Sequence, residues 1–243
     1  MIGLVLAAGA GRRLGPETNG IPKTLLHVRG SSTILDIALG NLAAVGLSDV
    51  AVVVGYAADA IRRRKAELEE RHGVRLELIF NDRALDWNNA YSLWLAREHF
   101  AEGALLINGD TVHPPSVEHT LLTNRGPELL LAVDDEKSLA DEEMKVKFGL
   151  DGRLEAIHKS LDPADADGEY IGACLIEPRA ASAFADALEA TWRRDPQLYY
   201  EDGIAAFAEQ GGDVRGVPIG TVDWVEVDDP TDLARARIIA CRY

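Results

Sequence analysis

Runs of apolar residues with almost no charge recur through the first half of the chain, and such runs are typical of strands buried on both faces. They lie at residues 2–6, 49–54 and 104–108. An alternating segment at 75–80 predicts a further strand. Residues 34–45 and 57–72 carry helical patterns between these strands. This strand–helix–strand order predicts a parallel sheet with right-handed helical crossovers.

The second half of the chain has a less regular pattern. Strands are expected at 129–133, 144–148, 153–158, 168–176 and 221–228. Asp151-Gly152 is a typical hairpin turn between the second and third of these strands. Helices are expected from Asn88 or Asn89 to Phe100, from Pro178, from about Leu198, and from Asp229 or Thr231 to Cys241. The whole pattern predicts a single α/β domain, with a mainly parallel mixed sheet in a Rossmann-like three-layer α/β/α arrangement.

Composition narrows the classes of protein that this chain can be. Its 243 residues fit one α/β domain, and Cys174 and Cys241 are too far apart to suggest a disulfide framework. The formal net charge of −15 argues against a nucleic-acid partner. The cysteine usage makes a reducing cytoplasm the expected location, and no apolar run is long enough for a membrane span. A homodimer is the oligomeric state that we consider.

The loop after the first strand has the composition of an anion-binding loop. Residues 7–15 contain small residues, glycines, and the pair Arg12 and Arg13, and Lys23 follows soon after. Glycines permit close approach of a ligand, and free N–H groups in such loops bind anions. The Walker pattern is absent, and Leu14 stands where the dinucleotide fingerprint needs its third glycine. The loop therefore predicts a polyphosphate site of another kind.

Two segments together resemble a known enzyme family. Residues 6–14 (Leu-Ala-Ala-Gly-Ala-Gly-Arg-Arg-Leu) and 22–25 (Pro-Lys-Thr-Leu) resemble the motif of nucleotidyltransferases that make CDP-alcohols and NDP-sugars. The segment 80–93, with Phe-Asn-Asp and then Asn-Asn-Ala-Tyr-Ser-Leu, is similar to the phosphocholine and aminoethylphosphonate cytidylyltransferases. The resemblance implies one nucleotidyltransferase domain over 1–243, with a nucleotide-binding half at 1–111 and an acceptor-binding half at 112–243.

This resemblance also implies which residues bind the nucleotide. The implied set is Leu6, Ala7, Ala8, Gly9, Ala10, Gly11, Arg12, Arg13, Lys23, Gly55, Asn81, Asn89, Ala90 and Asp110. Asn88 and Asn89 have an alternative role as plain helix caps. The amide of an asparagine also pairs well with the edge of a pyrimidine.

The family places two magnesium-binding aspartates at the ends of strands, and the resemblance assigns Asp110 and Asp228 to these positions. Asp223 and Asp229 are alternatives for the second ligand. In open parallel sheets, ligands bind beyond the carboxyl ends of the strands, so Asp110 is expected on the same edge as the glycine loop. Lys23, Arg13, Asp110 and Asp228 are the expected catalytic residues, and Mg²⁺ is the expected cofactor.

The acceptor is expected to contact the second half of the chain. Family members have a lysine near the acceptor phosphate, which makes Lys145 or Lys147 a candidate, while an exposed strand face is the alternative for both. Acidic and aromatic residues suggest a cationic or polyhydroxyl head group, unless they are ordinary core aromatics and surface acids. The candidates are Glu169, Tyr199, Tyr200, Glu201 and Asp202, with Trp87, Glu142, Glu143 and Trp224 nearby.

The resulting functional hypothesis is Mg²⁺-dependent transfer of CMP from CTP, or of another nucleotide, to a small phosphorylated or phosphono alcohol, with release of pyrophosphate. Phosphocholine, 2-aminoethylphosphonate and 2-hydroxyethylphosphonate are acceptors of this type. One alternative keeps the chemistry and takes inositol 1-phosphate or a sugar 1-phosphate. Another is a nucleotide-binding module without catalysis.

Overall fold

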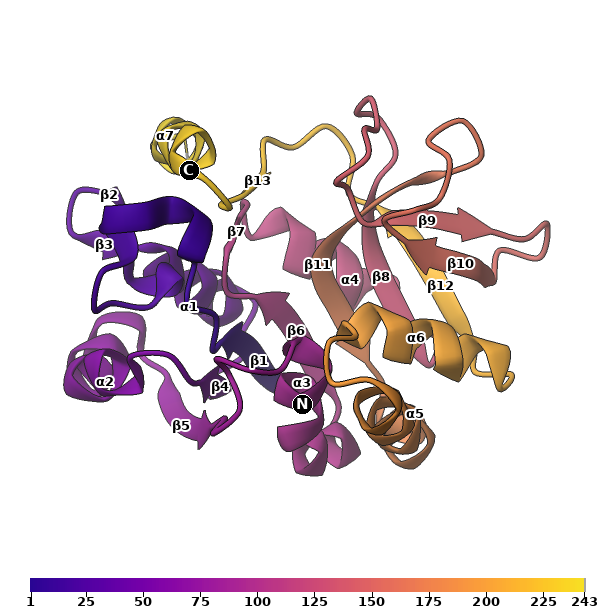
Figure 1. Ribbon diagram of the computed structural model, residues 1–243, viewed down its shortest axis with the longest axis horizontal. Coiled ribbons are helices and arrows are strands. Elements are labelled where there is room, and N and C mark those ends of the chain that lie inside the picture. Colours follow the sequence, from indigo (N-terminus) through magenta and orange to yellow (C-terminus); the bar gives the residue numbers. More distant parts are fainter. Residues whose placement is uncertain (243) are drawn as a thin grey trace.

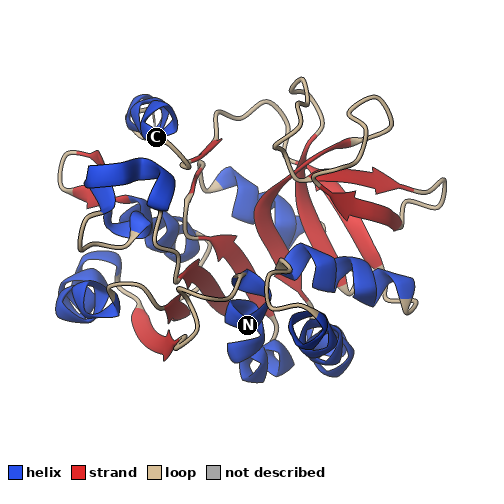
Figure 2. Cartoon of the chain, viewed as in Figure 1, coloured by secondary structure: helices blue, strands red, loops and turns tan. Residues whose placement is uncertain are grey.

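A nine-stranded mixed sheet forms the centre of the protein in the computed structural model, which describes residues 1–242 (Figures 1 and 2). Seven strands follow one another in the order β10 (Leu154–His158), β9 (Lys145–Phe148), β11 (Gly168–Ile176), β6 (Ala104–Asn108), β1 (Ile2–Ala7), β4 (Asp49–Val54) and β5 (Arg75–Phe80). β8 (Leu129–Asp134) pairs with β11 and with β12 (Val214–Pro218). The strands β6, β1, β4 and β5 are mutually parallel, and β11 is antiparallel to β6, which confirms the predicted mixed sheet.

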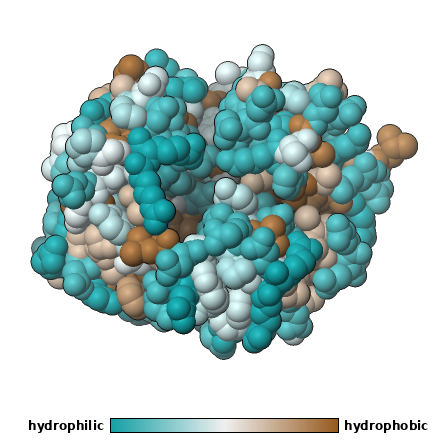
Figure 3. Space-filling model, in the orientation of Figure 1, coloured by the Kyte–Doolittle hydropathy of each residue, from teal (hydrophilic) through white to brown (hydrophobic). Residues whose placement is uncertain are grey.

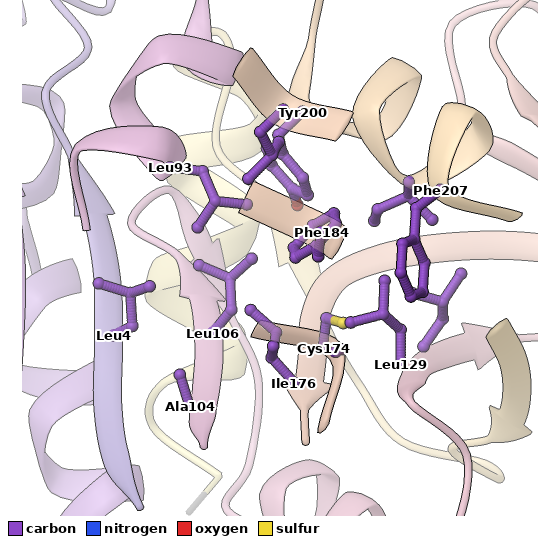
Figure 4. Close-up of a cluster of buried hydrophobic side chains, with 14 of the residues drawn as sticks. Leu4, Leu93, Ala104, Leu106, Leu129, Cys174, Ile176, Phe184, Tyr200 and Phe207 are labelled. Carbon is purple, nitrogen blue, oxygen red and sulfur yellow. The ribbon is translucent and has the colours of Figure 1, made fainter. Parts of the chain in front are cut away.

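Helices cover both faces of this sheet, because alternate residues of its central strands point to opposite sides. Leu4 packs into one core with Leu106 and Phe184, as Figure 4 shows, whereas Val5 packs into the other. The first core is covered by α3 (Asn89–Leu95), α5 (Ala181–Arg194) and α6 (Tyr200–Glu209), and the second by α1 (Ile34–Ala44), α2 (Ala58–His72) and α4 (Ser116–Thr123). The predicted three-layer α/β/α arrangement is confirmed.

Several elements differ from the expectations. The expected helix ending at Phe100 stops at Leu95, and a 3-10 helix (Arg97–Glu102) follows. Helix α4 and strand β12 were not expected, because a double proline precedes one and Arg215-Gly216 interrupts the apolar pattern of the other. Within residues 1–242, none of the helices has both the length and the apolar character to cross a bilayer.

The expected strand at 221–228 is wrong. Only β13 (Val225–Glu226) is extended, and it pairs with β7 (Thr111–Val112) outside the main sheet. The preceding segment turns instead, since the N–H of Val222 donates to the carbonyl of Gly220, which has a φ of +69°. The last helix, α7 (Pro230–Ile239), then packs beside β2 (His27–Arg29), which pairs with β3 (Ser32–Thr33).

Helix α1 begins on a capping box whose acidic member is buried. The backbone N–H and the hydroxyl of Thr33 both donate to Asp36 Oδ2, at 2.9 and 2.6 Å. Arg71 Nη1 and His72 Nε2 lie 3.0 and 2.9 Å from Asp36 Oδ1, and Arg64 lies 3.4 Å from Oδ2. Burial would raise the pKa of Asp36, but the hydrogen bonds of His72 and Thr33 and the charge of Arg64 outweigh it and lower that pKa. This carboxylate ties α1 to α2.

Replacing Asp36 with asparagine is expected to destabilise the fold by about 3 kcal/mol, because cationic partners then surround a neutral side chain. A carboxyl group with a lowered folded pKa contributes stability above its unfolded pKa, and the contribution is lost as the pH falls. The difference in unfolding free energy between wild type and Asp36→Asn should therefore shrink from about pH 5 towards about pH 2. Urea unfolding at several pH values measures it. Glu67→Gln is the control, since Glu67 pairs with the same arginines at the surface. Equal effects of the two substitutions would contradict the expectation.

Candidate active site

The glycine loop lies at the carboxyl edge of the sheet, where β1 and its parallel neighbour β6 end. The N–H of Gly109 donates to the carbonyl of Leu6 at 2.9 Å, so the two strand ends are held together. A Cβ at Gly109 would come within 2.3 Å of that carbonyl oxygen, so only glycine fits. Gly11 has a φ of +59° and starts the 3-10 helix Arg12–Thr18. This backbone places Arg12, Arg13 and Lys23 around one space.

A cavity of about 350 Å³ opens beside this loop, and we call it the glycine-loop cavity. Figure 3 shows a hollow on this face of the molecule with mainly hydrophilic residues around it. Residues expected at a nucleotide or acceptor site gather in the cavity wall, although they come from distant parts of the chain. They are Leu6, Ala8, Gly9, Gly11, Arg12, Arg13, Lys23, Asn89, Asp110, Tyr199, Glu201 and Asp228.

Other expected nucleotide-binding residues lie behind the cavity wall. Asn81 is buried, and its amide donates to Ser92 at 2.8 Å and accepts from the N–H of Arg83 at 2.7 Å. Gly55 packs closely against the glycine loop, since a Cβ at this position would lie 3.0 Å from Ala8. Ala7 and Ala90 are also buried, and Ala10 is half-buried. The wall of the glycine-loop cavity contains none of Ala7, Ala10, Gly55, Asn81 and Ala90.

A compact charge cluster stands at one end of the glycine-loop cavity. Lys23 Nζ lies 2.9 Å from Asp110 Oδ2 and 2.8 Å from Asp228 Oδ1, and Arg13 Nη2 lies 2.5 Å from Asp228 Oδ2. Lys23 is only 8% exposed. Burial would lower the pKa of Lys23, but the two carboxylates raise it, so the ammonium stays charged. Burial would raise the pKa of Asp228, and Lys23 and Arg13 lower it.

The short ladder between β7 and β13 brings the two aspartates together. Thr111 is in register with Glu226, and the N–H of Val227 donates to the carbonyl of Asp110 at 2.9 Å. Asp110 and Asp228 flank this ladder, so both side chains reach Lys23. The alternatives for the second aspartate serve elsewhere, because Asp223 pairs with Arg242 and Asp229 caps α7.

Glu226 belongs to this cluster and was not expected from the sequence. Carboxylate oxygens of Asp110, Glu226 and Asp228 all lie within 4.8 Å of one another. Glu226 is exposed along the cavity wall, and partial desolvation together with the charges of Asp110 and Asp228 raises its pKa. The sequence contained one signal for Glu226, because alternation along the expected strand places the side chains of residues 226 and 228 on the same face.

The cluster fits a hard divalent cation. Mg²⁺ prefers carboxylate oxygens and binds through one or two of them together with phosphate oxygens. Asp110 Oδ1 is buried and has no hydrogen-bond partner among residues 1–242, so it remains available as a ligand atom. Asp110, Glu226 and Asp228 are the residues that could hold such an ion.

A second cavity of about 460 Å³, which we call the acidic cavity, adjoins the cluster on its other side. Lys159, Glu226 and Asp228 line both cavities. Lys159 was also not expected, because no motif surrounds it. The other acidic residues in the wall are Asp134, Glu136, Glu142, Glu143, Glu169, Asp223 and Asp232, beside Trp224, Lys137 and Arg235. The carboxylate cluster thus stands between the glycine-loop cavity, whose wall has as many basic as acidic side chains, and a cavity whose wall is mainly acidic.

The expected acceptor residues divide between the cavities and the interior. Glu169 lines the acidic cavity, whereas Tyr199 and Glu201 line the glycine-loop cavity. Burial raises the pKa of Glu201 to about 8, and its Oε2 has no hydrogen-bond partner within residues 1–242. Tyr200 is fully buried and is hydrogen-bonded to Asn108, and Asp202 accepts from the N–H of Tyr199.

The two lysine candidates of β9 line neither cavity in the described part of the chain. Lys145 is fully buried, and its ammonium donates to the carbonyls of Ala140, Asp141 and Glu143 at 2.8, 3.1 and 3.3 Å. Lys147 is half-buried on the same strand. The three carbonyl contacts make Lys145 the anchor of the loop before β9.

The chain is similar in sequence to several curated enzymes. It is 33% identical over 241 residues to a CMP-5'-(3-aminopropyl)phosphonate synthase of Streptomyces rubellomurinus, which covers 96% of this chain and 38% of that protein. It is 36% identical over 106 residues to a choline-phosphate cytidylyltransferase of Streptococcus pneumoniae, which covers 44% of this chain and 43% of that protein. The matches thus span about two fifths of the length of these relatives.

Solved structures share the fold. An inositol-1-phosphate CTP transferase from T. maritima superposes with a TM-score of 0.81 at 21% identity, covering 98% of this chain and 95% of that one. A CTP:phosphocholine cytidylyltransferase from Streptococcus pneumoniae superposes with a TM-score of 0.74, also at 21% identity, covering 98% of both chains. A family model, the MobA-like NTP transferase domain, matches residues 3–195. Because this match covers most of the chain, the protein belongs to the MobA-like NTP transferase family.

Proposed function

We propose that this protein is a Mg²⁺-dependent cytidylyltransferase that transfers CMP from CTP to a small phosphorylated or phosphono alcohol. The observation that carries the proposal is the buried Lys23 ammonium held between Asp110 and Asp228 at the end of the glycine-loop cavity. A polyphosphate loop beside charges of both signs suits phosphoryl transfer better than simple nucleotide binding. The named sequence relatives support CTP and a phosphonate or phosphocholine acceptor.

The reaction needs little proton chemistry. An acceptor oxygen bonds to the α-phosphorus of CTP, the bond from that phosphorus to the β-phosphate oxygen breaks, and pyrophosphate leaves with the electron pair. A phosphomonoester is largely dianionic at neutral pH, since its second pKa is about 6, so no general base is required. The residues must instead hold two anions together and neutralise the charge that develops. Lys23 and Arg13 are placed for this task, and the amides of the glycine loop suit the outer phosphates.

Asp110, Glu226 and Asp228 would hold the magnesium ion, which when bound supplies positive charge to the phosphate oxygens. If Asp110 and Asp228 bound the ion, their negative charge would be shared between the ion and Lys23. The ammonium of Lys23 would then attract a phosphate more strongly. Lys23 therefore links the acidic cluster to the glycine loop.

The acidic cavity is the proposed site of the acceptor's head group. It adjoins the carboxylate cluster, and Trp224 offers an aromatic face among several carboxylates. An ammonium group gains roughly 0.5–2 kcal/mol from such a face. The same carboxylates would accept hydrogen bonds from a polyhydroxyl head group. Inositol phosphate is therefore the second candidate, and the close fold match to an inositol-1-phosphate CTP transferase favours testing it.

A pyrophosphate-release assay tests this function directly. Each of CTP, UTP, ATP and GTP is combined with phosphocholine, 2-aminoethylphosphonate, 2-hydroxyethylphosphonate, inositol 1-phosphate or glucose 1-phosphate. We expect CTP with an ammonium-headed acceptor to give the highest kcat/KM. Highest activity with glucose 1-phosphate and another nucleotide would contradict the cytidylyltransferase assignment.

Replacing Lys23 with methionine is expected to lower kcat by at least about 10²-fold, because one preorganised charge contact to a developing anion has this value in other enzymes. The apparent KM for CTP should change less than kcat. Lys65→Met is the matched control, since Lys65 lies on the surface of α2 and pairs with Glu69. A Lys23 variant within about threefold of wild type in kcat would exclude the catalytic role.

Removal of divalent cations is expected to abolish turnover, and added Mg²⁺ should restore it. Glu226→Gln should raise the Mg²⁺ concentration needed for half-maximal rate by about tenfold, because one carboxylate ligand loses its charge. Asp49→Asn, at the surface beside Arg75, should leave that concentration unchanged. Full activity of the wild-type protein in excess EDTA would contradict the metal site.

A further inference from the structure

A lysine of the chain itself occupies the acidic cavity. Lys137 Nζ lies 2.6 Å from Glu169 Oε2, 3.3 Å from Glu143 Oε1 and 5.3 Å from the centre of the Trp224 ring. These three groups surround the ammonium with two negative charges and one aromatic face. An alkylammonium group is thus already bound at the place where the proposed function puts the head group of the acceptor.

The walls of this site are fixed independently of Lys137. The indole N–H of Trp224 donates to Asp134 Oδ2 at 2.7 Å, and Asp134 Oδ1 accepts the backbone N–H groups of residues 136 and 137. The other end of this loop, which joins β8 to β9, is held by Lys145, whose ammonium donates to the carbonyls of Ala140, Asp141 and Glu143. Both ends of the loop between β8 and β9, and the Trp224 ring, are therefore held by bonds that do not involve the Lys137 side chain.

The occupant is less firmly held than the walls. The side chain of Lys137 is 33% exposed, whereas those of Glu169 and Glu143 are 6% and 18% exposed. A lysine has a long flexible stem, so its ammonium can turn out to solvent while the backbone stays in place. The two carboxylates are more deeply buried, and Glu143 Oε2 also accepts the N–H of Ala140. Without any cation they would repel one another, and burial together with Glu143 already favours the protonated form of Glu169, whose pKa is raised to about 6 despite Lys137.

We propose that Lys137 is a specificity-determining residue whose ammonium holds the cation site of the acidic cavity and is displaced when an ammonium-headed acceptor binds. The inference rests on the proposed function for its substrate. Two ammonium groups cannot share this site, because like charges at contact distance repel strongly. A hydroxyl-headed acceptor has the opposite requirement, since Lys137 can stay and donate a hydrogen bond to the hydroxyl oxygen. Lys137 thereby lowers the preference of the cavity for ammonium over hydroxyl head groups.

Kinetics of Lys137→Met test the displacement, because methionine keeps much of the apolar stem and removes the charge. We expect the KM for 2-aminoethylphosphonate to fall by about tenfold and the KM for 2-hydroxyethylphosphonate to rise. Lys137→Arg, which keeps the positive charge, should retain the wild-type order of the two acceptors. The KM for CTP is the internal reference. A KM that rises for both acceptors would show that Lys137 only maintains the shape of the cavity and would overturn the proposal.

A second measurement needs no turnover. Choline carries the ammonium group without a phosphate, so it probes the cation site alone. Brief acetylation followed by mass spectrometry should show Lys137 reacting at least about threefold faster in saturating choline, with Lys65 at the surface as the internal standard. Unchanged labelling of Lys137 would overturn the displacement. If choline exposes Lys137 but no acceptor releases pyrophosphate, the proposed function fails and the displaceable cation remains.

Discussion

The buried ammonium of Lys23 is the constraint around which the site is built. An ammonium that is almost out of water is costly unless opposite charges lie against it, and here two carboxylates do so. Asp228 comes from a position 205 residues away in the sequence. The fold must therefore return its last segment to the edge where its first strand ends. The ladder between β7 and β13 performs this return, and a change there would disturb Asp110 and Asp228 together.

The placement of this cluster bears on how an acidic protein could bind the two anions of the proposed reaction. A net charge of −15 gives an unfavourable global field for any phosphate. In the structure, the basic side chains of the glycine loop lie apart from most of the carboxylates near the site. Arg12, Arg13 and Lys23 face the glycine-loop cavity, and most of the carboxylates near the site face the other cavity. Between the two cavities the carboxylate cluster forms a boundary, and the nucleotide and head group of the proposed reaction would bind in separate cavities that both adjoin it.

Much of this arrangement could be predicted from the sequence, because it depends on local pattern. The apolar runs that form β1, β4 and β6 identify the parallel centre of the sheet, and the glycine loop with Lys23 identifies the polyphosphate side. What could not be predicted depends on long-range pairing. Strand β12 has an interrupted apolar pattern and exists through its partner β8. Glu226 enters the cluster because the ladder between β7 and β13 brings it beside Asp110, and this long-range pairing cannot be read from the local sequence pattern.

The lysines show the same limit most clearly. Lys145 and Lys137 lie close in sequence, and the family resemblance made Lys145 or Lys147 the candidate for a contact with the acceptor. The structure buries Lys145 fully, and its ammonium donates hydrogen bonds to three backbone carbonyls, because a buried charge without such partners is costly. Lys137 has no pattern to mark it, yet the loop anchored by Lys145 presents it to Glu169 and Trp224. Lys145 thus holds the backbone of the loop, and Lys137 on the same loop forms the ion pair with Glu169. The sequence alone does not distinguish these two roles, because they depend on how the loop folds.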